Sequence, residues 1–214
     1  MPRTVRVPVP TGRELARAVP LVALAALPVV RTWHLQWGAE EDELAATLPG
    51  DELNPAPALT ATRAITVRAA PERVWPWVVQ IGQGRGGFYS YDALENLVGC
   101  RVRSADEVVD AWQRLAPGDQ VRLHPRVALD VVAVDPGRSL VVRSPDAAAA
   151  VPAFTWAFVL RAGRDRSTRL VVRERYAAPS LVVRAVVEPT AAVSGVMTRG
   201  MLRGLRRRVE SAAA

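Results

Sequence analysis

The chain has 214 residues, 50% of them hydrophobic, and a formal net charge of +7. This length fits one domain with extensions better than two full domains, and the hydrophobic share excludes a wholly disordered chain. A single cysteine, Cys100, cannot form an intrachain disulfide, and the sequence has no cysteine or histidine spacing typical of a metal site. We therefore expect no metal and no other cofactor.

The positive charge lies at the two ends of the chain. Residues 1–31 and residues 184–214 each carry a net charge of +4, whereas residues 32–183 carry −1. A nucleic-acid-binding domain usually has a basic face on its folded body, so nucleic acid is not an expected partner. Basic ends beside apolar segments fit an anionic membrane surface, and solvated tails are the alternative.

An apolar segment near the N-terminus is a candidate membrane contact. Residues 18–30 are thirteen apolar residues in a row, flanked by arginines. Two of the thirteen are prolines, Pro20 and Pro28. A spanning helix needs about 20 apolar residues, and prolines weaken it. We interpret the segment as a tether or interfacial element; a packed or loose N-terminal helix and a cleaved signal peptide are the alternatives. The expected localisation is cytoplasmic, free or membrane-associated through this segment.

Residues 39–59 are first acidic and then rich in proline, which predicts a boundary. Residues 40–44 (EEDEL) favour the start of a short helix, because acidic side chains suit a helix N-terminus. Residues 49–51 (PGD) predict a turn, and residues 54–57 (NPAP) predict a stiff linker. We therefore divide the chain into an N-terminal extension, residues 1–58, and a folded domain, residues 59–210.

The folded domain begins with one strand and several helices. Residues 60–67 are rich in β-branched side chains and predict the first strand. A helix is predicted over residues 71–80, because a proline suits the first turn of a helix. Further helices are predicted over residues 91–98 and 104–115.

The next part of the domain alternates apolar and polar residues with a period of two, which is typical of strands. Turn residues such as 135–138 (DPGR) and 163–167 (GRDRS) separate the runs. Strands joined by short turns form an antiparallel meander. The predicted strands cover residues 120–124, 128–134, 139–143, 155–160 and 169–176.

A long C-terminal helix closes the domain. Residues 179–187 are rich in valine, and Pro189 is expected to break or restart the helix before residues 190–209. Apolar residues at every fourth position predict one stripe facing the sheet, made of Val193, Met197, Met201, Leu205 and Val209. Glycines disfavour a helix by about 1 kcal/mol each, so three of them here predict either close packing or the lining of an empty space: Gly195, Gly200 and Gly204.

This order of elements predicts an α+β domain with helices on one face of the sheet. With this order, four stretches resemble the SRPBCC superfamily, the START-like helix-grip proteins that include a polyketide cyclase/dehydrase group. The resemblance covers about residues 60–210. Its second stretch resembles a bacterial, largely uncharacterised subgroup. The stretches are residues 64–77, residues 80–97, residues 156–160 with 168–173, and residues 188–189 with 201–204.

The resemblance implies a curved antiparallel sheet wrapped around the C-terminal helix, with a hydrophobic cavity between them. Members of the superfamily transport lipids, bind hormones or cyclise polyketides, so the fold does not set one activity. We expect the chain to bind a small hydrophobic molecule such as a lipid, isoprenoid or polyketide. Transport of this molecule is one form that the function can take. The alternatives are a polyketide cyclase or aromatase acting in the same cavity, and a membrane-surface or partner-binding protein without a ligand.

Residues 82–87 (GQGRGG) match the glycine pattern of dinucleotide-binding loops. A dinucleotide site needs this pattern between a strand and a helix. Here a predicted helix precedes it. We therefore interpret the stretch as a loop between two helices, either a cavity lid or a structural turn.

Two groups of polar residues beside aromatic residues are candidate ligand contacts. One lies between residues 85 and 96, where it either orients a ligand head group or fixes the loop through an arginine–carboxylate pair and helix capping. The other depends on the pairing of residues 154–160 with residues 170–176. The matching register would place Glu174 beside the aromatic residues, as a ligand anchor. The opposite face, with Arg169, Arg173 and Arg175, is expected to be solvated.

His124 is interpreted either as an acid or base in the cavity or as an exposed strand residue. The sequence contains no nucleophile–histidine–acid set, so catalytic residues are unknown and enzymatic activity is left open. The candidate ligand-binding residues, in the cavity or at its mouth, are Arg85, Phe88, Tyr89, Tyr91, Trp112, His124, Trp156, Phe158, Glu174, Tyr176, Met197 and Met201.

Overall fold

The computed structural model describes residues 26–145 and 154–212. The chain divides into two compact units, Met1–Trp33 and His34–Ala214. In the first unit, residues 26–33 are helical. Most of the apolar segment at residues 18–30 lies outside the described residues, so its contact with a membrane stays a prediction.

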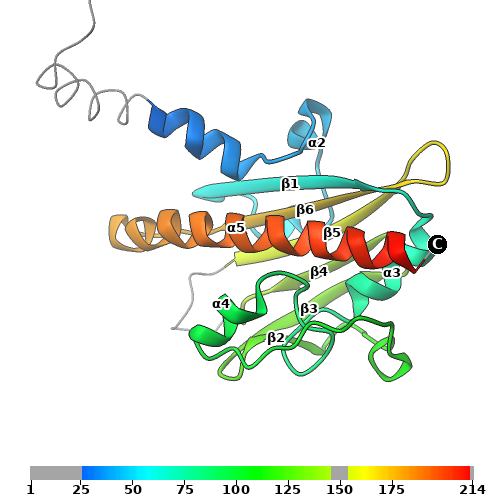
Figure 1. The fold of residues 1–214 in the computed structure, drawn as a ribbon. Helices are drawn as coiled ribbons and strands as arrows, with labels where there is room; N and C mark the ends of the chain where they lie inside the picture. Colours follow the sequence, from blue (N-terminus) through cyan, green and yellow to red (C-terminus); the bar gives the residue numbers. More distant parts are fainter. Residues whose placement is uncertain (1–25, 146–153, 213–214) are drawn as a thin grey trace, which may run out of the picture. The chain divides into compact units, whose positions relative to one another are not determined.

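Among the described residues, a six-stranded antiparallel sheet organises the second unit (Figure 1). Its strand order is β1-β6-β5-β4-β3-β2, so the last five strands form a meander and the first strand pairs with the last. This arrangement confirms the predicted α+β class. The strands are β1 (Leu59–Val67), β2 (Gln120–His124), β3 (Val127–Asp135), β4 (Ser139–Arg143), β5 (Phe154–Ala162) and β6 (Thr168–Tyr176).

The helices also follow the predicted order, with one exception. They are α2 (Glu41–Ala45), α3 (Pro71–Val79), α4 (Asp92–Leu97) and α5 (Leu181–Ser211), with short 3-10 turns η1 (Asp51–Leu53) and η2 (Asp110–Trp112). The helix predicted over residues 104–115 is wrong apart from η2. Side chains hold the backbone there in place of helical bonds: the Gln80 side chain bonds Glu107 O and Val109 N, each at 3.0 Å.

Helix α5 is continuous through Pro189, so the predicted break is wrong. Ser180 caps the helix by accepting a hydrogen bond from Val183 N, and Thr190 Oγ1 donates to Val186 O at 2.8 Å beside the proline. A proline removes one helical bond, but tertiary packing supplies most of the stability of a helix in a protein. Here that packing is the contact of α5 with the sheet.

The predicted apolar stripe on α5 is correct only in part. Met201, Leu205 and Val209 are buried, Met197 is half-buried, and Val193 is 65% exposed. Each step of four residues turns the helix by about 400°, so the stripe drifts by about 40° per step and leaves the side that faces the sheet. The buried side continues toward the N-terminus through Thr198, Ala191 and Val187.

The outer face of the sheet, turned away from α5, is covered by the segment that contains α2 and η1. Leu48 packs there with Ala64, Val159 and Val171 in a second, small hydrophobic core. The segment belongs to the predicted N-terminal extension, whose boundary at residue 59 stays a prediction. The packing shows that this segment contributes to the fold of the second unit.

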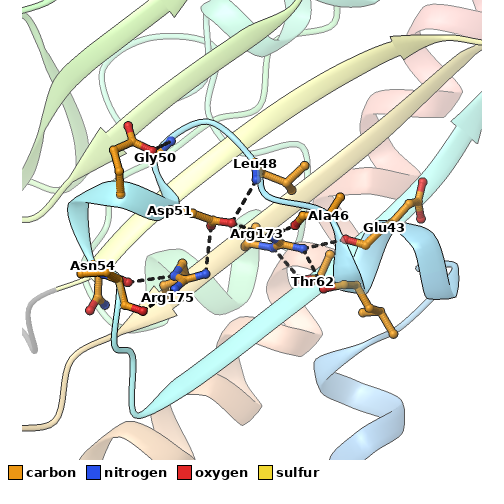
Figure 2. Close-up of polar contacts among 12 residues, drawn as sticks. Glu43, Ala46, Leu48, Gly50, Asp51, Asn54, Thr62, Arg173 and Arg175 are labelled. Atoms are coloured by element: carbon orange, nitrogen blue, oxygen red, sulfur yellow. Dashed lines mark hydrogen bonds and ion pairs between the residues drawn. The ribbon is translucent and has the colours of Figure 1, made fainter.

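Arg173 is buried on this outer face, which makes the predicted solvated face wrong (Figure 2). Its guanidinium donates to Asp51 at 2.7 Å, to Ala46 O at 2.7 Å and to Glu43 O at 2.6 Å. Arg175 also pairs with Asp51, and Arg169 pairs with Glu43 at 2.6 Å. The alternation of the strand identifies the face that these arginines share, but it cannot show that a distant segment supplies their acceptors.

Replacing Asp51 with asparagine should lower the free energy of unfolding by about 2 kcal/mol, because buried Arg173 loses its charged acceptor while the neutral amide can still accept from Leu48 N. Urea unfolding measures the change. Glu52→Gln, at an exposed carboxylate next to it, is the matched control, with an expected change below about 0.5 kcal/mol. Equal stability of the two variants would contradict the importance of this contact.

Candidate functional site

Strands β5 and β6 pair in the register that brings the candidate aromatic residues and Glu174 to one face. Phe154 lies opposite Tyr176, and Trp156 lies opposite Glu174. Phe154 and Tyr176 stack with 5.4 Å between ring centroids, and Trp156 and Phe158 lie 4.6 Å apart. All four rings are buried on the inner face, which faces α5. We call these four side chains the aromatic wall.

The carboxylate of Glu174 is the centre of a buried polar cluster between the sheet and α5. It accepts hydrogen bonds from Arg63 at 3.0 Å, Tyr176 at 2.7 Å, Ser194 at 2.8 Å and Thr198 at 2.9 Å. The side chains of Arg63 and Glu174 are 0% and 2% exposed, so they form a buried ion pair. Two of the four donors come from the sheet and two from α5, so the cluster fixes the helix on the sheet.

Both charges in this cluster are saturated by the fold itself. Besides Glu174, Arg63 donates to His34 O at 2.8 Å and to Ala191 O at 3.3 Å. Burial, and then the charge of Glu174, raise the pKa of Tyr176, so its hydroxyl stays protonated and donates. Buried charges need such complete pairing. A ligand that bound Glu174 would have to displace one of the present donors.

Trp156 has a buried donor without an acceptor. Its indole Nε1 is closed to solvent and finds no hydrogen-bond partner among the described residues. A buried donor left unpaired costs about 1–3 kcal/mol, and most such groups in folded proteins are paired. The unpaired Nε1 lies in the aromatic wall, on the strand opposite the saturated Glu174. This atom is therefore a buried polar position of the inner face that is vacant as far as the described part of the chain shows.

The glycine-rich loop at residues 82–87 is a closed turn. Gly82 and Gly87 form an isolated antiparallel bridge, and Gly86 N donates to Gln80 O at 2.8 Å. The loop follows α3 and carries no helix at its end, so the geometry of a dinucleotide site is absent at this loop. Of the two interpretations of this stretch, a cavity lid and a structural turn, these contacts fit the structural turn.

The glycines of α5 allow close packing rather than lining an empty space. A side-chain carbon added at Gly204 would lie 1.8 Å from Tyr89 O, and one added at Gly200 would lie 2.7 Å from the ring of Tyr91. Gly195 meets the Arg63 guanidinium at 3.1 Å. The candidate residues Tyr89 and Tyr91 are therefore docked onto α5. The hydroxyl of Tyr89 donates to Trp77 O at 3.0 Å.

Arg85 and Trp112 line a separate hollow of about 600 Å³ between loops. Arg85 donates to Val79 O at 3.1 Å and to Trp112 O at 2.5 Å, so the predicted arginine–carboxylate pair is wrong. Burial lowers the pKa of Arg85, and Asp119 offsets this only in part. A second hollow, of about 490 Å³, lies at the turn between β3 and β4. Neither hollow is lined by the aromatic wall.

The remaining candidates do not gather at the aromatic wall as one set. Tyr91 is 43% exposed, and Met201 and Phe88 are core residues. His124 is half-buried beside the bulge of β2, where its Nδ1 accepts from Arg126 N at 3.1 Å. The structure brings together Trp156, Phe158, Glu174 and Tyr176 from the candidate set.

The sheet order, the two short helices α3 and α4 after the first strand, and a long C-terminal helix held against the inner face are the features of a helix-grip domain. The chain has a helix-grip-like α+β fold. No protein-family model and no curated protein matches it.

The similarity to solved structures is distant. A protein from Mesorhizobium loti is 14% identical, with a TM-score of 0.46, over 72% of this chain and 98% of its own. A protein from Thermobifida fusca is 16% identical, with a TM-score of 0.47, over 71% and 93%. A polyketide-cyclase-like protein from Corynebacterium glutamicum is 15% identical, with a TM-score of 0.42, over 72% and 93%. Similarity at this level does not say what this chain binds.

Three members of the polar cluster, Arg63, Ser194 and Thr198, were not among the residues predicted from the sequence. Arg63 interrupts the apolar residues that β1 places on the inner face, and a charge at such a position signals a buried partner. Ser194 and Thr198 are four residues apart and therefore share one side of α5. Both signals are present in the sequence, but the prediction for α5 considered only its apolar residues and glycines and not its hydroxyl side chains.

Glu95 should give the stability of the chain a measurable pH dependence. Burial raises the pKa of Glu95 above its ordinary value of 4.5; a hydrogen bond from Ser90 opposes the rise, and the charge of Asp92 adds to it. The folded chain therefore holds this proton more tightly than the unfolded chain, so stability falls as the pH rises from about 4.5 through the folded pKa. Glu95→Gln should flatten the profile of unfolding midpoint between about pH 4 and pH 7.

The Glu41→Gln variant is the matched control for this experiment, because it makes the same change at an exposed glutamate of α2. Its profile should run parallel to that of the unmodified chain. A profile for Glu95→Gln that also runs parallel would show that Glu95 titrates with the same pKa in the folded and unfolded chain.

Proposed function

We propose that the chain binds a small, largely apolar molecule between β5 and α5. A polar group of this molecule accepts a hydrogen bond from Trp156 Nε1. The observation that supports the proposal is the unpaired buried indole N–H in the aromatic wall. The expected ligands, a lipid, an isoprenoid or a polyketide, each combine an apolar body with a carbonyl or hydroxyl group. Such a group matches the indole N–H of Trp156, which has no acceptor among the described residues.

The surroundings of Trp156 favour a ligand over a trapped water. A buried water needs two to four polar partners. The cross-strand neighbours of Trp156 are Val142, which has no polar side-chain atom, and Glu174, whose oxygens already accept from four side chains. An apolar molecule with one acceptor group can accept a hydrogen bond from the indole N–H while its apolar part packs against the rings of the aromatic wall.

The same contacts favour binding over turnover. Acid–base chemistry needs a titratable group within reach of the reacting atom. The Glu174 oxygens are occupied, and His124 lies on β2, at the far edge of the sheet from β1, with Nδ1 engaged by Arg126 N. The cyclase or aromatase alternative therefore has less support than a carrier or sensor of the ligand.

Removing the indole donor should weaken the binding of ligands that carry an acceptor. In Trp156→Phe, the affinity for a neutral fluorescent naphthyl ketone should fall about tenfold, as expected for the loss of one hydrogen bond of roughly 1.4 kcal/mol. The affinity for diphenylhexatriene, which has no acceptor, should change less than twofold. Fluorescence titration measures both affinities.

Trp75→Phe is the matched control, because Trp75 is a half-buried tryptophan on α3 and its replacement removes an indole outside the aromatic wall. It should leave both affinities unchanged. If the unmodified chain takes up neither probe, or if Trp156→Phe binds the ketone as tightly as the unmodified chain, the proposal is wrong.

A further inference from the structure

The first half of α5 exposes a continuous apolar surface. Leu181 is 84% exposed, Val182 77%, Val186 51%, Val193 65% and Val196 55%. Large apolar side chains at such exposure are uncommon on the surface of a monomeric protein when they are contiguous. In Figure 1 this half of the helix, in orange, extends beyond the end of β1.

These residues share one side of the helix. With about 100° per residue, all five lie within an arc of about 140°. The buried residues of the same helix, among them Val187, Ala191 and Thr198, are centred on the opposite side. The exposed arc therefore cannot be part of the core, and we call it the outer strip. The outer strip carries no charged residue between Leu181 and Val196.

The second half of α5 continues the outer strip with positive charge. Arg199, Arg203 and Arg207 follow at spacings of four residues on the same side, and Arg203 lies over the ring of Trp37 at 5.2 Å. Of the acidic residues of α5, Glu210 pairs with Arg68 and Glu188 is outside the arc. One helix face is therefore apolar in its first half and basic in its second half.

We propose that the outer strip of α5 docks the protein on an anionic lipid bilayer. Valine and leucine side chains enter the interface, and the arginines meet the negative head groups, as in amphipathic helices that lie in the membrane plane. By length and composition α5 is also apolar enough to cross a membrane, which alone is weak evidence. Its inner side is bound to Glu174 through Ser194 and Thr198, so the helix lies along the membrane rather than across it. This proposal does not depend on the ligand proposed above.

Vesicle flotation of the full chain tests the proposal. The chain should float with vesicles of phosphatidylcholine and phosphatidylglycerol, and bind vesicles of phosphatidylcholine alone at least fivefold more weakly. Binding should fall as salt is raised. The double variant V186E/V193E should lose at least tenfold in vesicle affinity, and Arg207→Gln should lose affinity for the anionic vesicles only.

The control is Leu53→Glu, the same kind of change at an exposed apolar residue of η1 on the outer face of the sheet. It should bind vesicles as the unmodified chain does. Vesicle binding that survives in V186E/V193E would assign the contact to another segment and overturn the proposal. A concentration-dependent dimer that this variant abolishes, without any vesicle binding, would show that a second copy covers the strip.

Discussion

Replacing Glu174 with alanine should lower the free energy of unfolding by about 3–5 kcal/mol, the range for breaking a buried ion pair from one side. The loss is this large because Arg63 would stay fully buried without a charged acceptor. Three neutral donors would also lose their acceptor: the hydroxyls of Tyr176, Ser194 and Thr198. Urea unfolding followed by circular dichroism measures the difference.

Two further variants distinguish the contribution of the ion pair to the free energy of unfolding from the effect of lost packing. Arg63→Met alone should cost a similar amount, because it leaves the carboxylate of Glu174 buried and unpaired. The double variant Glu174→Ala with Arg63→Met should cost less than the sum of the two single changes by at least about 2 kcal/mol. Additive single effects would show that the two charges do not stabilise each other.

Replacing Gly204 with alanine should lower the free energy of unfolding by about 3 kcal/mol. The new methyl group would lie 1.8 Å from the backbone oxygen of Tyr89, and a backbone atom cannot rotate away as a side chain can. Tyr89 has a φ of 57°, a conformation that few residues other than glycine adopt, so its loop has little freedom to move. The clash should outweigh the gain of about 1 kcal/mol that alanine brings to a helix.

The three glycines of α5 provide their own comparison. Gly200→Ala should cost less than Gly204→Ala, because the methyl group meets the ring of Tyr91, which is partly exposed and can shift. Gly195→Ala should cost least, with 3.1 Å to the Arg63 guanidinium. The unfolding midpoints should follow this order. If Gly204→Ala is as stable as the unmodified chain, α5 and the Tyr89 loop are not in close contact.

The strand pattern was sufficient to predict the sheet and the aromatic wall. Alternation along β5 and β6 has a period of two, and it identified the face that Trp156, Glu174 and Tyr176 share once the two strands pair in register. The helix-starting proline at residue 71 and the turn at residues 135–138 are local signals of the same kind. Signals of this sort depend only on neighbouring residues.

The features that the sequence did not predict depend on contacts between distant segments. The burial of Arg173 requires the carbonyl groups of residues 43 and 46 and the carboxylate of Asp51, more than a hundred residues away in the chain. The saturation of Glu174 likewise requires Arg63 from β1 and two hydroxyls of α5. Local patterns place a charge on a face, but only the tertiary structure shows what pairs with it.

Native mass spectrometry of the freshly purified full chain tests the central claim, that the interior holds an apolar ligand on Trp156. We expect one small apolar molecule with a carbonyl or hydroxyl group per chain, identified after organic extraction and retained at least severalfold less by Trp156→Phe than by Trp75→Phe. A chain that carries no such molecule and takes up no apolar probe would contradict the claim.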